Sequence, residues 1–133
     1  KATDPIIDFG GFGGAAKIID KNGNVLWEYS VSDNDFIAHH DVEMLPNGNI
    51  LLMVWERITN DIAVSNGADF NTDLFTEKIV EVNPSNNEVV WEWRSWDHII
   101  QDKFEGLANY GDLNSNNTTI KFDFKAPALF IAS

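Results

Sequence analysis

The sequence predicts an all-β fold of antiparallel strands joined by tight turns. Asn-Gly pairs at Asn22-Gly23 and Asn47-Gly48 each lie between runs of β-branched and large apolar residues. Asparagine and glycine tolerate the positive φ that a two-residue hairpin turn requires. We therefore expect hairpins over Lys17 to Tyr29 and Asp41 to Trp55, and a third over Lys78 to Arg94.

An internal repeat is the second observation. The first and third hairpins match strand for strand, and the third has a longer turn, Asn83 to Asn87. The spacing of the repeat is longer than a minimal propeller blade. We expect the polar stretch Thr59 to Asn71 to be an inserted loop that accounts for much of this extra length. The matching segments are Lys17-Ile18-Ile19-Asp20 with Lys78-Ile79-Val80-Glu81, and Val25 to Tyr29 with Val89 to Trp93.

The strands are expected to form antiparallel four-stranded meander blades. Asp41 to Arg94 would supply one blade, and Ala15 to Ser30 the last two strands of the blade before it. A sandwich or an open meander has the same pattern, but the repeat favours about one and a half blades of a β-propeller. We divide the chain into a Gly-rich lead-in (1–14), a propeller-blade segment (15–113), and a polar linker with a C-terminal tail strand (114–133).

Composition excludes several functions. The chain has 9 basic and 21 acidic residues, and its net charge of −12 argues against nucleic acid and anionic membranes as partners. No apolar run approaches the roughly 18 residues of a membrane span. The absence of cysteine excludes disulfides and thiolate metal sites. An acidic surface of this kind is typical of a periplasmic or extracellular protein, and we interpret Lys1 as a cut end.

The candidate chemistry lies in His39-His40-Asp41, at the start of a predicted strand. Neighbouring side chains on a strand point to opposite faces, so we expect at most one of the two histidines to face a site. Such a pair is more often a surface feature than a catalytic one. A zinc site takes three or four ligands, and His98 is the only other histidine, so no metal is expected.

Other motifs have structural interpretations. His98 lies beside Trp96 and Ile99, an apolar setting that favours a structural hydrogen bond. The five tryptophans could stack on an aryl ring, but their recurrence at equivalent strand positions favours packing. Gly10 to Gly14 lacks the lysine of a phosphate loop and is interpreted as a tight backbone crossing.

The order of these segments resembles the bacterial arylsulfate sulfotransferase family and its arylsulfotransferase-like relatives. The resemblance covers about Phe9 to Asp112, through the runs FGGFGGAAKIIDKNGNVLWEY, HHDVEMLPNGNILLMVWE, EKIVEVN, EVVWEWRSWDHIIQD and NYGD. It implies a six-bladed propeller with its active site in the central channel. It further implies transfer of a sulfuryl group from an aryl sulfate to a phenol through a sulfated histidine, without a nucleotide cofactor.

The resemblance assigns His40 as the sulfate-contacting residue, because it directly precedes an acid as in the family's His-Asp element. His39 would be its packing neighbour, and Asp41 would orient an imidazole or end the strand. Trp96 and His98 are candidates for substrate binding. A neutral imidazole is nucleophilic, and cationic groups can balance charge on the sulfuryl oxygens.

The family pattern continues into further blades with another histidine, an arginine and a second His-Asp element, which the resemblance associates with the nucleophile. None of these has a counterpart here. This chain alone is therefore expected to lack most of the catalytic set. Two hypotheses follow. The chain is a segment of a sulfotransferase-like enzyme, or it is a non-catalytic extracellular module that self-assembles through open sheet edges. In the second case the tail Ile120 to Ile131 would contribute a strand.

Overall fold

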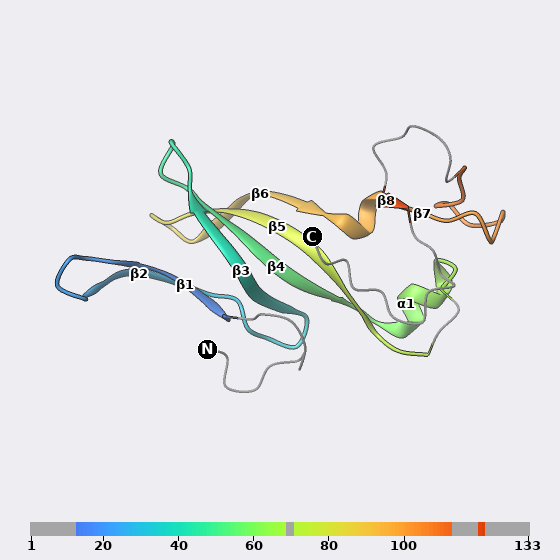
Figure 1. Ribbon diagram of the computed structural model, residues 1–133, viewed down its shortest axis with the longest axis horizontal. Coiled ribbons are helices and arrows are strands. Elements are labelled where there is room, and N and C mark those ends of the chain that lie inside the picture. The colour runs from blue at the N-terminus through green and yellow to red at the C-terminus, as the bar shows by residue number, and fades with distance from the viewer. Residues whose placement is uncertain (1–12, 69–70, 113–119, 122–133) are drawn as a thin grey trace. The chain divides into compact units, whose positions relative to one another are not determined.

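The computed structural model describes residues 13–68, 71–112 and 120–121, and most of these residues are in β-strands. This confirms the predicted all-β class. Figure 1 shows the elements in chain order. They are β1 (Ala15–Ile19), β2 (Val25–Ser30), β3 (Phe36–Met44), β4 (Ile50–Ile58), α1 (Asn60–Ser65), β5 (Leu74–Asn83), β6 (Glu88–Arg94), the 3₁₀ helix η1 (Ser95–His98), β7 (Ile99–Ile100) and β8 (Ile120–Lys121).

The chain divides into two compact units, residues 1–56 with 77–93 and residues 57–76 with 94–133. The first unit holds the two-stranded sheet β1-β2 and most of a four-stranded sheet with the order β3-β4-β5-β6. Each strand of that sheet neighbours the next in sequence, as the predicted meander requires. The second unit holds α1, η1, β7 and β8.

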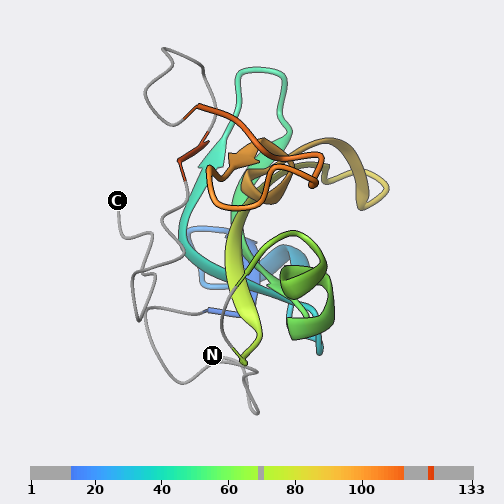
Figure 2. The same cartoon turned by 90° about the vertical axis from the view of Figure 1, so that its right-hand side faces the viewer.

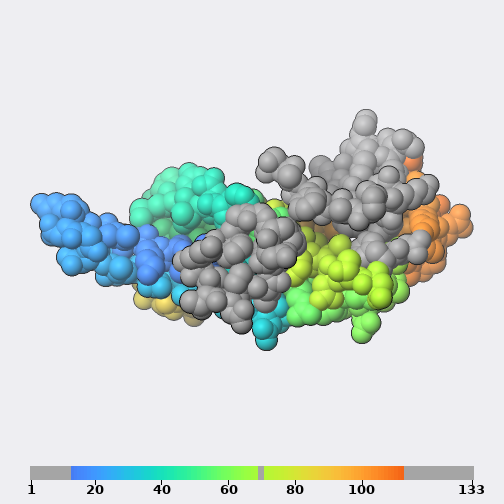
Figure 3. Space-filling view, turned by 60° about the horizontal axis from the view of Figure 1, so that its bottom comes forward, coloured from blue at the N-terminus to red at the C-terminus, as the bar shows by residue number. Residues whose placement is uncertain are grey.

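The predicted turns are confirmed. Gly23 joins β1 to β2 with φ of 88°, and Gly48 joins β3 to β4 with φ of 83°. In the third turn, Asn87 is the residue with positive φ, at 60°. These angles lie where a Cβ is disfavoured and where glycine and asparagine are tolerated, so local turn chemistry sets the connections. The β1–β2 turn projects in blue at the end of the hairpin in Figure 3.

The internal repeat extends to side-chain contacts. Lys17 on β1 forms an ion pair with Glu28 on β2 at 2.9 Å, and Lys78 on β5 forms one with Glu92 on β6, also at 2.9 Å. These are equivalent positions in the two copies of the repeat. Their recurrence is evidence of equivalent strand pairing.

The core of the first unit lies between the two sheets. Alternate residues of β4 and β5 point into it, as the two-residue period of a strand requires. Ile18, Trp27 and Tyr29 of the β1–β2 hairpin pack against this cluster. Each fully buried aliphatic side chain stabilises the fold by about 1.5–3 kcal/mol. The buried residues are Ala16, Ile50, Leu52, Val54, Val80 and Val82.

A carboxylate on β5 fixes the tip of the neighbouring hairpin. Glu81 Oε1 accepts hydrogen bonds from the side-chain amides of Asn49 at 2.6 Å and Asn47 at 3.0 Å. Both bonds lower the pKa of Glu81, and the bond from Asn49 has the larger effect. Asn87 similarly accepts a 2.8 Å bond from the indole N–H of Trp27, which ties the β5–β6 turn to the first hairpin.

The second unit differs from the prediction. The segment Thr59 to Asn71, expected to be a loop, contains α1, which is visible in green in Figure 2. The start of α1 is held by Asp73, which accepts from the Asn60 N–H at 2.8 Å and pairs with Arg57 at 2.6 Å. Both contacts lower the pKa of Asp73, and the hydrogen bond from Asn60 has the larger effect. Because Asp73 follows the helix in the sequence, the local sequence pattern did not reveal these contacts.

Most of the predicted tail lies outside the described residues. Within it, Ile120 and Lys121 form β8, which pairs in parallel with Ile99 and Ile100 of β7. The segment SWDH forms the 3₁₀ helix η1. Around it, Ile58, Ala63, Ala68 and Ile99 form the buried core of the second unit.

The turn at Gly48 provides a test of the fold. A Cβ added at Gly48 meets no atom within 4 Å, so substitution there changes backbone strain without a steric clash. We expect Gly48→Ala to lower the free energy of unfolding by about 1 kcal/mol, since alanine disfavours positive φ. Gly48→Asn is the matched control, because asparagine tolerates this region, and it should lose less. Equal losses in chemical denaturation would contradict the turn assignment.

Candidate functional site

The site is built on an irregularity in β3. Ala38 pairs with Val54 and Val42 pairs with Leu52, so β3 advances four residues while β4 advances two. His39, His40 and Asp41 lie in this bulge. Because two extra residues are inserted, Val42 still pairs with the buried Leu52, although β3 itself is exposed from His40 onward. Bulges of this kind re-aim side chains and are common beside active sites.

His40 has a backbone conformation that is unusual for its residue type. Its φ is 48°, and His40 and Asn87 are the two non-glycine residues with positive φ among the described residues. Asn87 lies in a turn, whereas His40 lies inside a strand. A left-handed residue in a strand is sterically unfavourable and is retained where the surrounding structure imposes it. The strain therefore coincides with the residue that the sequence marked for sulfate contact.

The bulge corrects one prediction. A regular strand would point His39 and His40 to opposite faces, but here their rings meet edge to face, with centroids 5.0 Å apart. The Nδ1 atoms of the two rings are 2.7 Å apart, which is hydrogen-bonding distance. The prediction is wrong because it assumed regular alternation, and the positive φ of His40 turns its side chain toward His39.

His39 is held on two further sides. It is 4% exposed, and its ring stacks on Trp55 with centroids 4.3 Å apart. Its Nε2 lies 2.9 Å from Oε2 of Glu77 on β5. This approach satisfies the distance of an ion pair but is not aligned as a hydrogen bond, since neither atom has a hydrogen-bond partner. The pair is therefore in close polar contact without a hydrogen bond.

Three residues therefore form a continuous chain of polar atoms. Glu77 contacts His39, His39 contacts His40, and the outer nitrogen of His40, Nε2, is left at the exposed end. Glu77 was not among the candidates from the sequence. The available signal was a glutamate within the apolar strand pattern EKIVEVN, since a sheltered carboxylate needs a polar partner.

A small cavity adjoins the histidines. Its volume is about 80 Å³, and its lining includes both histidines, Asp41, and Ala15 and Ala16 of β1. Drug-sized ligands occupy pockets of roughly 300–1,000 Å³, so this cavity admits a small group and not a whole aryl ester.

A close backbone approach borders this cavity. The N–H groups of Gly13 and Gly14 both donate to the Ala38 carbonyl. The tight crossing predicted for the glycine-rich segment is seen at these two glycines, and residues 10–12 lie outside the described residues. The crossing therefore anchors the strand immediately before the bulge.

Asp41 plays a local part. Its Oδ1 accepts the Val42 N–H at 3.1 Å, and β3 continues past it to Met44, so it does not end the strand. The carboxylate in contact with the histidine pair is that of Glu77 on β5. Asp41 nevertheless lines the cavity beside His40.

Trp96 and His98 lie in the second unit, in η1. With Asn66, Asn109 and their neighbours they line a cavity of about 370 Å³, which is large enough for an aromatic ring. The structure therefore brings Trp96 and His98 together with each other. The histidine pair belongs to the first unit and lines a different cavity.

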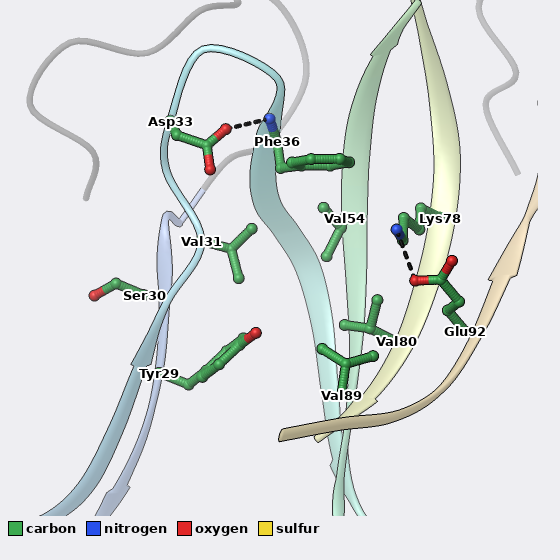
Figure 4. Close-up of a pocket in the computed structure, with 10 residues that line it drawn as sticks. All are labelled: Tyr29, Ser30, Val31, Asp33, Phe36, Val54, Lys78, Val80, Val89 and Glu92. Carbon is green, nitrogen blue, oxygen red and sulfur yellow. Dashed lines mark hydrogen bonds and ion pairs between the residues drawn. The ribbon is translucent and has the colours of Figure 1, made fainter. Parts of the chain in front are cut away.

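A further cleft in the first unit, shown in Figure 4, has a volume of about 220 Å³. It is lined largely by apolar side chains, among them Phe36, Val54 and Val80. Its cation, Lys78, is paired with Glu92 and lies 4.9 Å from the centre of the Phe36 ring. Because that charge is already balanced, this cleft is a weaker candidate for an anionic substrate.

Within the described residues, no group of three or more histidine, cysteine or acidic side chains is arranged to hold a metal ion. A search of the same residues found no helix with the length and apolarity needed to cross a membrane.

The strain at His40 gives a test that is independent of activity. His40→Ala and His40→Gly both remove the imidazole, but only alanine retains the steric penalty at positive φ. We expect the glycine variant to be more stable than the alanine variant by about 1 kcal/mol in chemical denaturation. At His98, where φ is not positive, the same pair should show the opposite order, because glycine there loses more chain entropy. The same order at both positions would contradict the left-handed conformation of His40.

Comparison with known proteins identifies a family match. No curated protein and no solved structure matches the chain. The sequence profile of the family described as arylsulfotransferase (ASST) matches residues 3–125. The match extends at both ends beyond Phe9 to Asp112, the segment that carried the resemblance. Since it covers nearly the whole sequence, this chain belongs to the arylsulfotransferase (ASST) family.

Proposed function

We propose that this chain provides part of a site that transfers a sulfuryl group from an aryl sulfate to a phenol. The carrying observation is the strained, exposed His40 beside a cavity that fits a small group. Family membership supplies the reaction class. An aryl sulfate would place its sulfuryl group at this cavity and leave its ring outside.

The chemistry balances through a sulfated histidine. The imidazole nitrogen bonds to sulfur while the bond from sulfur to the aryl oxygen breaks, and the phenolate leaves with the bonding electrons. An acceptor phenolate then attacks the sulfur, and the electron pair returns to nitrogen. A neutral histidine is suited to both half-reactions because its sulfated form is a good leaving group.

Local charge limits what the described residues can do alone. The transferring group is anionic, and stabilising it needs donors or cations aimed at its oxygens. Arg57 is paired with Asp73, and Arg94 is paired with Asp97 at 3.2 Å. Lys17 and Lys78 likewise have glutamate partners. We propose that groups beyond this part of the chain complete the oxyanion contacts, as the family pattern of further blades implies.

We further propose that the two sheets belong to neighbouring blades of a propeller. The supporting observations are the repeated Lys–Glu pairs and the packing of the β1–β2 hairpin on the four-stranded sheet. On this proposal residues 15–113 form the blade segment, and the protein acts in the periplasm or outside the cell. No resident cofactor takes part in the proposed reaction.

Binding of 4-nitrophenyl sulfate tests the proposed function. We expect saturable shifts of the His40 ring signals in NMR spectra of the 133-residue chain, with little change at His98. 4-Nitrophenol, which lacks the sulfuryl group, is the matched control ligand and should leave the His40 ring unchanged. Equal shifts with both compounds, or shifts confined to His98 and Trp96, would place binding elsewhere and contradict the proposal.

In the same samples we expect no more than trace release of nitrophenolate in the presence of a phenol, because the oxyanion contacts are incomplete. Rapid turnover that is lost in His40→Ala but retained in His39→Ala would contradict this expectation. It would establish the chain as a minimal enzyme.

Exposed apolar side chains motivate a proposal about association. Val42 and Met44 on β3, and Val90 and Trp91 on β6, are each about half exposed. Val54, Val80 and Val82, in contrast, belong to the buried core against which the β1–β2 hairpin packs. In a propeller the exposed residues would meet another blade; in the isolated chain we propose that they meet a second copy.

Light scattering tests this proposal. We expect the mass of the full chain to rise above that of a monomer with increasing concentration, and deletion of residues 120–133 to reduce the rise if the tail supplies a strand. Val90→Lys should also reduce it, because a charge on the contact face opposes association. A monomer at all concentrations would contradict self-association, and an unchanged mass after deletion would exclude the tail.

A further inference from the structure

We propose that Asn22 is a site of spontaneous covalent modification, the loss of its side-chain amide, and that the fold protects the other asparagines that precede a glycine. The chain has such pairs at Asn22-Gly23, Asn47-Gly48 and Asn66-Gly67. Glycine has no side chain to hinder approach to its backbone nitrogen, so an asparagine before it is especially prone to this reaction. The inference concerns the durability of the β1–β2 hairpin and does not depend on the proposed function.

The reaction needs water as its only co-reactant. The backbone nitrogen of the glycine attacks the side-chain carbonyl carbon, Cγ, of the asparagine. A bond forms between these two atoms, the bond from Cγ to Nδ2 breaks, and the amide nitrogen leaves as ammonia with the proton of the glycine N–H. One water molecule then opens the cyclic imide to give aspartate or its β-linked isomer, isoaspartate. Because the carboxamide must first rotate toward the glycine nitrogen, contacts that hold the carboxamide slow the reaction.

The backbone contacts of these pairs are alike. In each pair the glycine N–H donates to the carbonyl of the residue three positions earlier, at 2.9–3.0 Å. Each glycine also has positive φ, between 83° and 99°. The backbone therefore gives no reason for one pair to react before another, and the difference must come from the asparagine side chains.

The carboxamides of Asn47 and Asn66 are held. Nδ2 of Asn47 donates to Glu81 at 3.0 Å, and its Oδ1 accepts the Asn49 N–H at 3.0 Å, so both ends of this carboxamide are occupied. Asn66 is partly buried, and its Nδ2 donates to the Ile62 carbonyl at 2.9 Å. Rotation of either carboxamide toward the following glycine would break these bonds.

The carboxamide of Asn22 is free by comparison. Asn22 is exposed at the tip of the hairpin, and it bonds to Asp20 Oδ1 at 2.8 Å through its backbone N–H. The Asp20 side chain, which also accepts from Asn24, holds this turn in place of Asn22. Within the described residues, no hydrogen bond holds the Asn22 carboxamide, so it can rotate toward Gly23 without losing one.

Modification would weaken the hairpin tip. Isoaspartate adds one carbon atom to the main chain before Gly23, which disrupts the hydrogen bond from the Gly23 N–H to the Asp20 carbonyl. The new carboxylate would also lie near Asp20. Hydrogen bonds, with that from the Asn24 side chain having the largest effect, lower the pKa of Asp20 and keep it ionised. Two like charges in one turn repel each other, so the modified turn is less favourable than the original.

The test is to incubate the full chain in mildly alkaline buffer, which promotes loss of the glycine N–H proton, and to locate the products by tandem mass spectrometry. We expect Asn22 to react about tenfold faster than Asn47, since the bond from Asn47 to Glu81 is a hydrogen bond to a charged group. Asn66 should also react slowly. In denaturant, where the shared Asn-Gly sequence remains without the fold, the rates should become similar. Equal rates at Asn22 and Asn47 in the folded chain, or a faster rate at Asn47, would overturn the proposal.

Variants identify the cause of the protection. Glu81→Ala removes the acceptor, and we expect the rate at Asn47 to rise about tenfold while the rate at Asn22 stays the same. Glu81→Gln keeps a side-chain oxygen as acceptor and should preserve most of the protection. Glu43→Ala removes an exposed glutamate from β3 and is the matched control for lost charge, so it should change neither rate.

Asn66 is the internal reporter of unfolding in these variants, because it lies in the other compact unit. A faster reaction at Asn47 in Glu81→Ala, with Asn66 still slow, supports protection by Glu81. An unchanged rate at Asn47 in the same variant, again with Asn66 slow, would contradict it.

Discussion

The two-residue bulge in β3 is the constraint on which the rest of the site depends. It places His39 against Trp55, forces His40 to positive φ and brings the two rings together. Pairing with β4 resumes at Val42, opposite the buried Leu52. The strain is held from both ends. On one side the N–H groups of Gly13 and Gly14 bind the Ala38 carbonyl, and on the other Glu81 fixes the turn beyond Met44. A bulge between two anchored segments is slow to relax to a regular strand, which is the condition for retaining a strained residue.

The electrostatics of the chain make local arrangement decisive. A net charge of −12 repels an anionic substrate at long range, although salt screens that repulsion beyond about 10 Å. Binding must therefore come from close contacts. Among the described residues, several cations form ion pairs with carboxylates, so their charges are already balanced. They include Lys17, Arg57, Lys78 and Arg94. This explains why a histidine, which can be nucleophilic without a net charge, is suited to the site where a lysine would be captured by the acidic surface.

Much of the fold was predictable because the signals were local. Asn22-Gly23 and Asn47-Gly48 fix turns through φ preferences, and the repeat of Lys17 to Asp20 in Lys78 to Glu81 carried the strand pairing with it. The start of β3 at Phe36 was missed because the bulge interrupts the alternation that marks a strand. The helix α1 was missed because its first turn is held by Asp73, a residue after the helix.

The site was predictable only in part, because its contacts also come from distant parts of the sequence. His40 was selected through its place before an acid, but the carboxylate that meets an imidazole comes from β5, and no spacing rule within the His39-His40-Asp41 segment could identify it. Side-chain direction was also misjudged, because the expectation of opposite faces holds for a regular strand and fails at a bulge.

Two glutamates on β5 differ in what they contact. Glu81 and Glu77 project from the same strand at positions of the same parity, so they lie on the same face of the sheet. Glu81 accepts from the amides of Asn47 and Asn49, which have no second tautomer, so its contacts can position a turn but cannot change where a proton lies. Glu77 contacts an imidazole, whose two nitrogens exchange donor and acceptor roles. Glu81 is therefore a structural clamp at one end of the strand, and Glu77 is the carboxylate that contacts the histidine pair at the other.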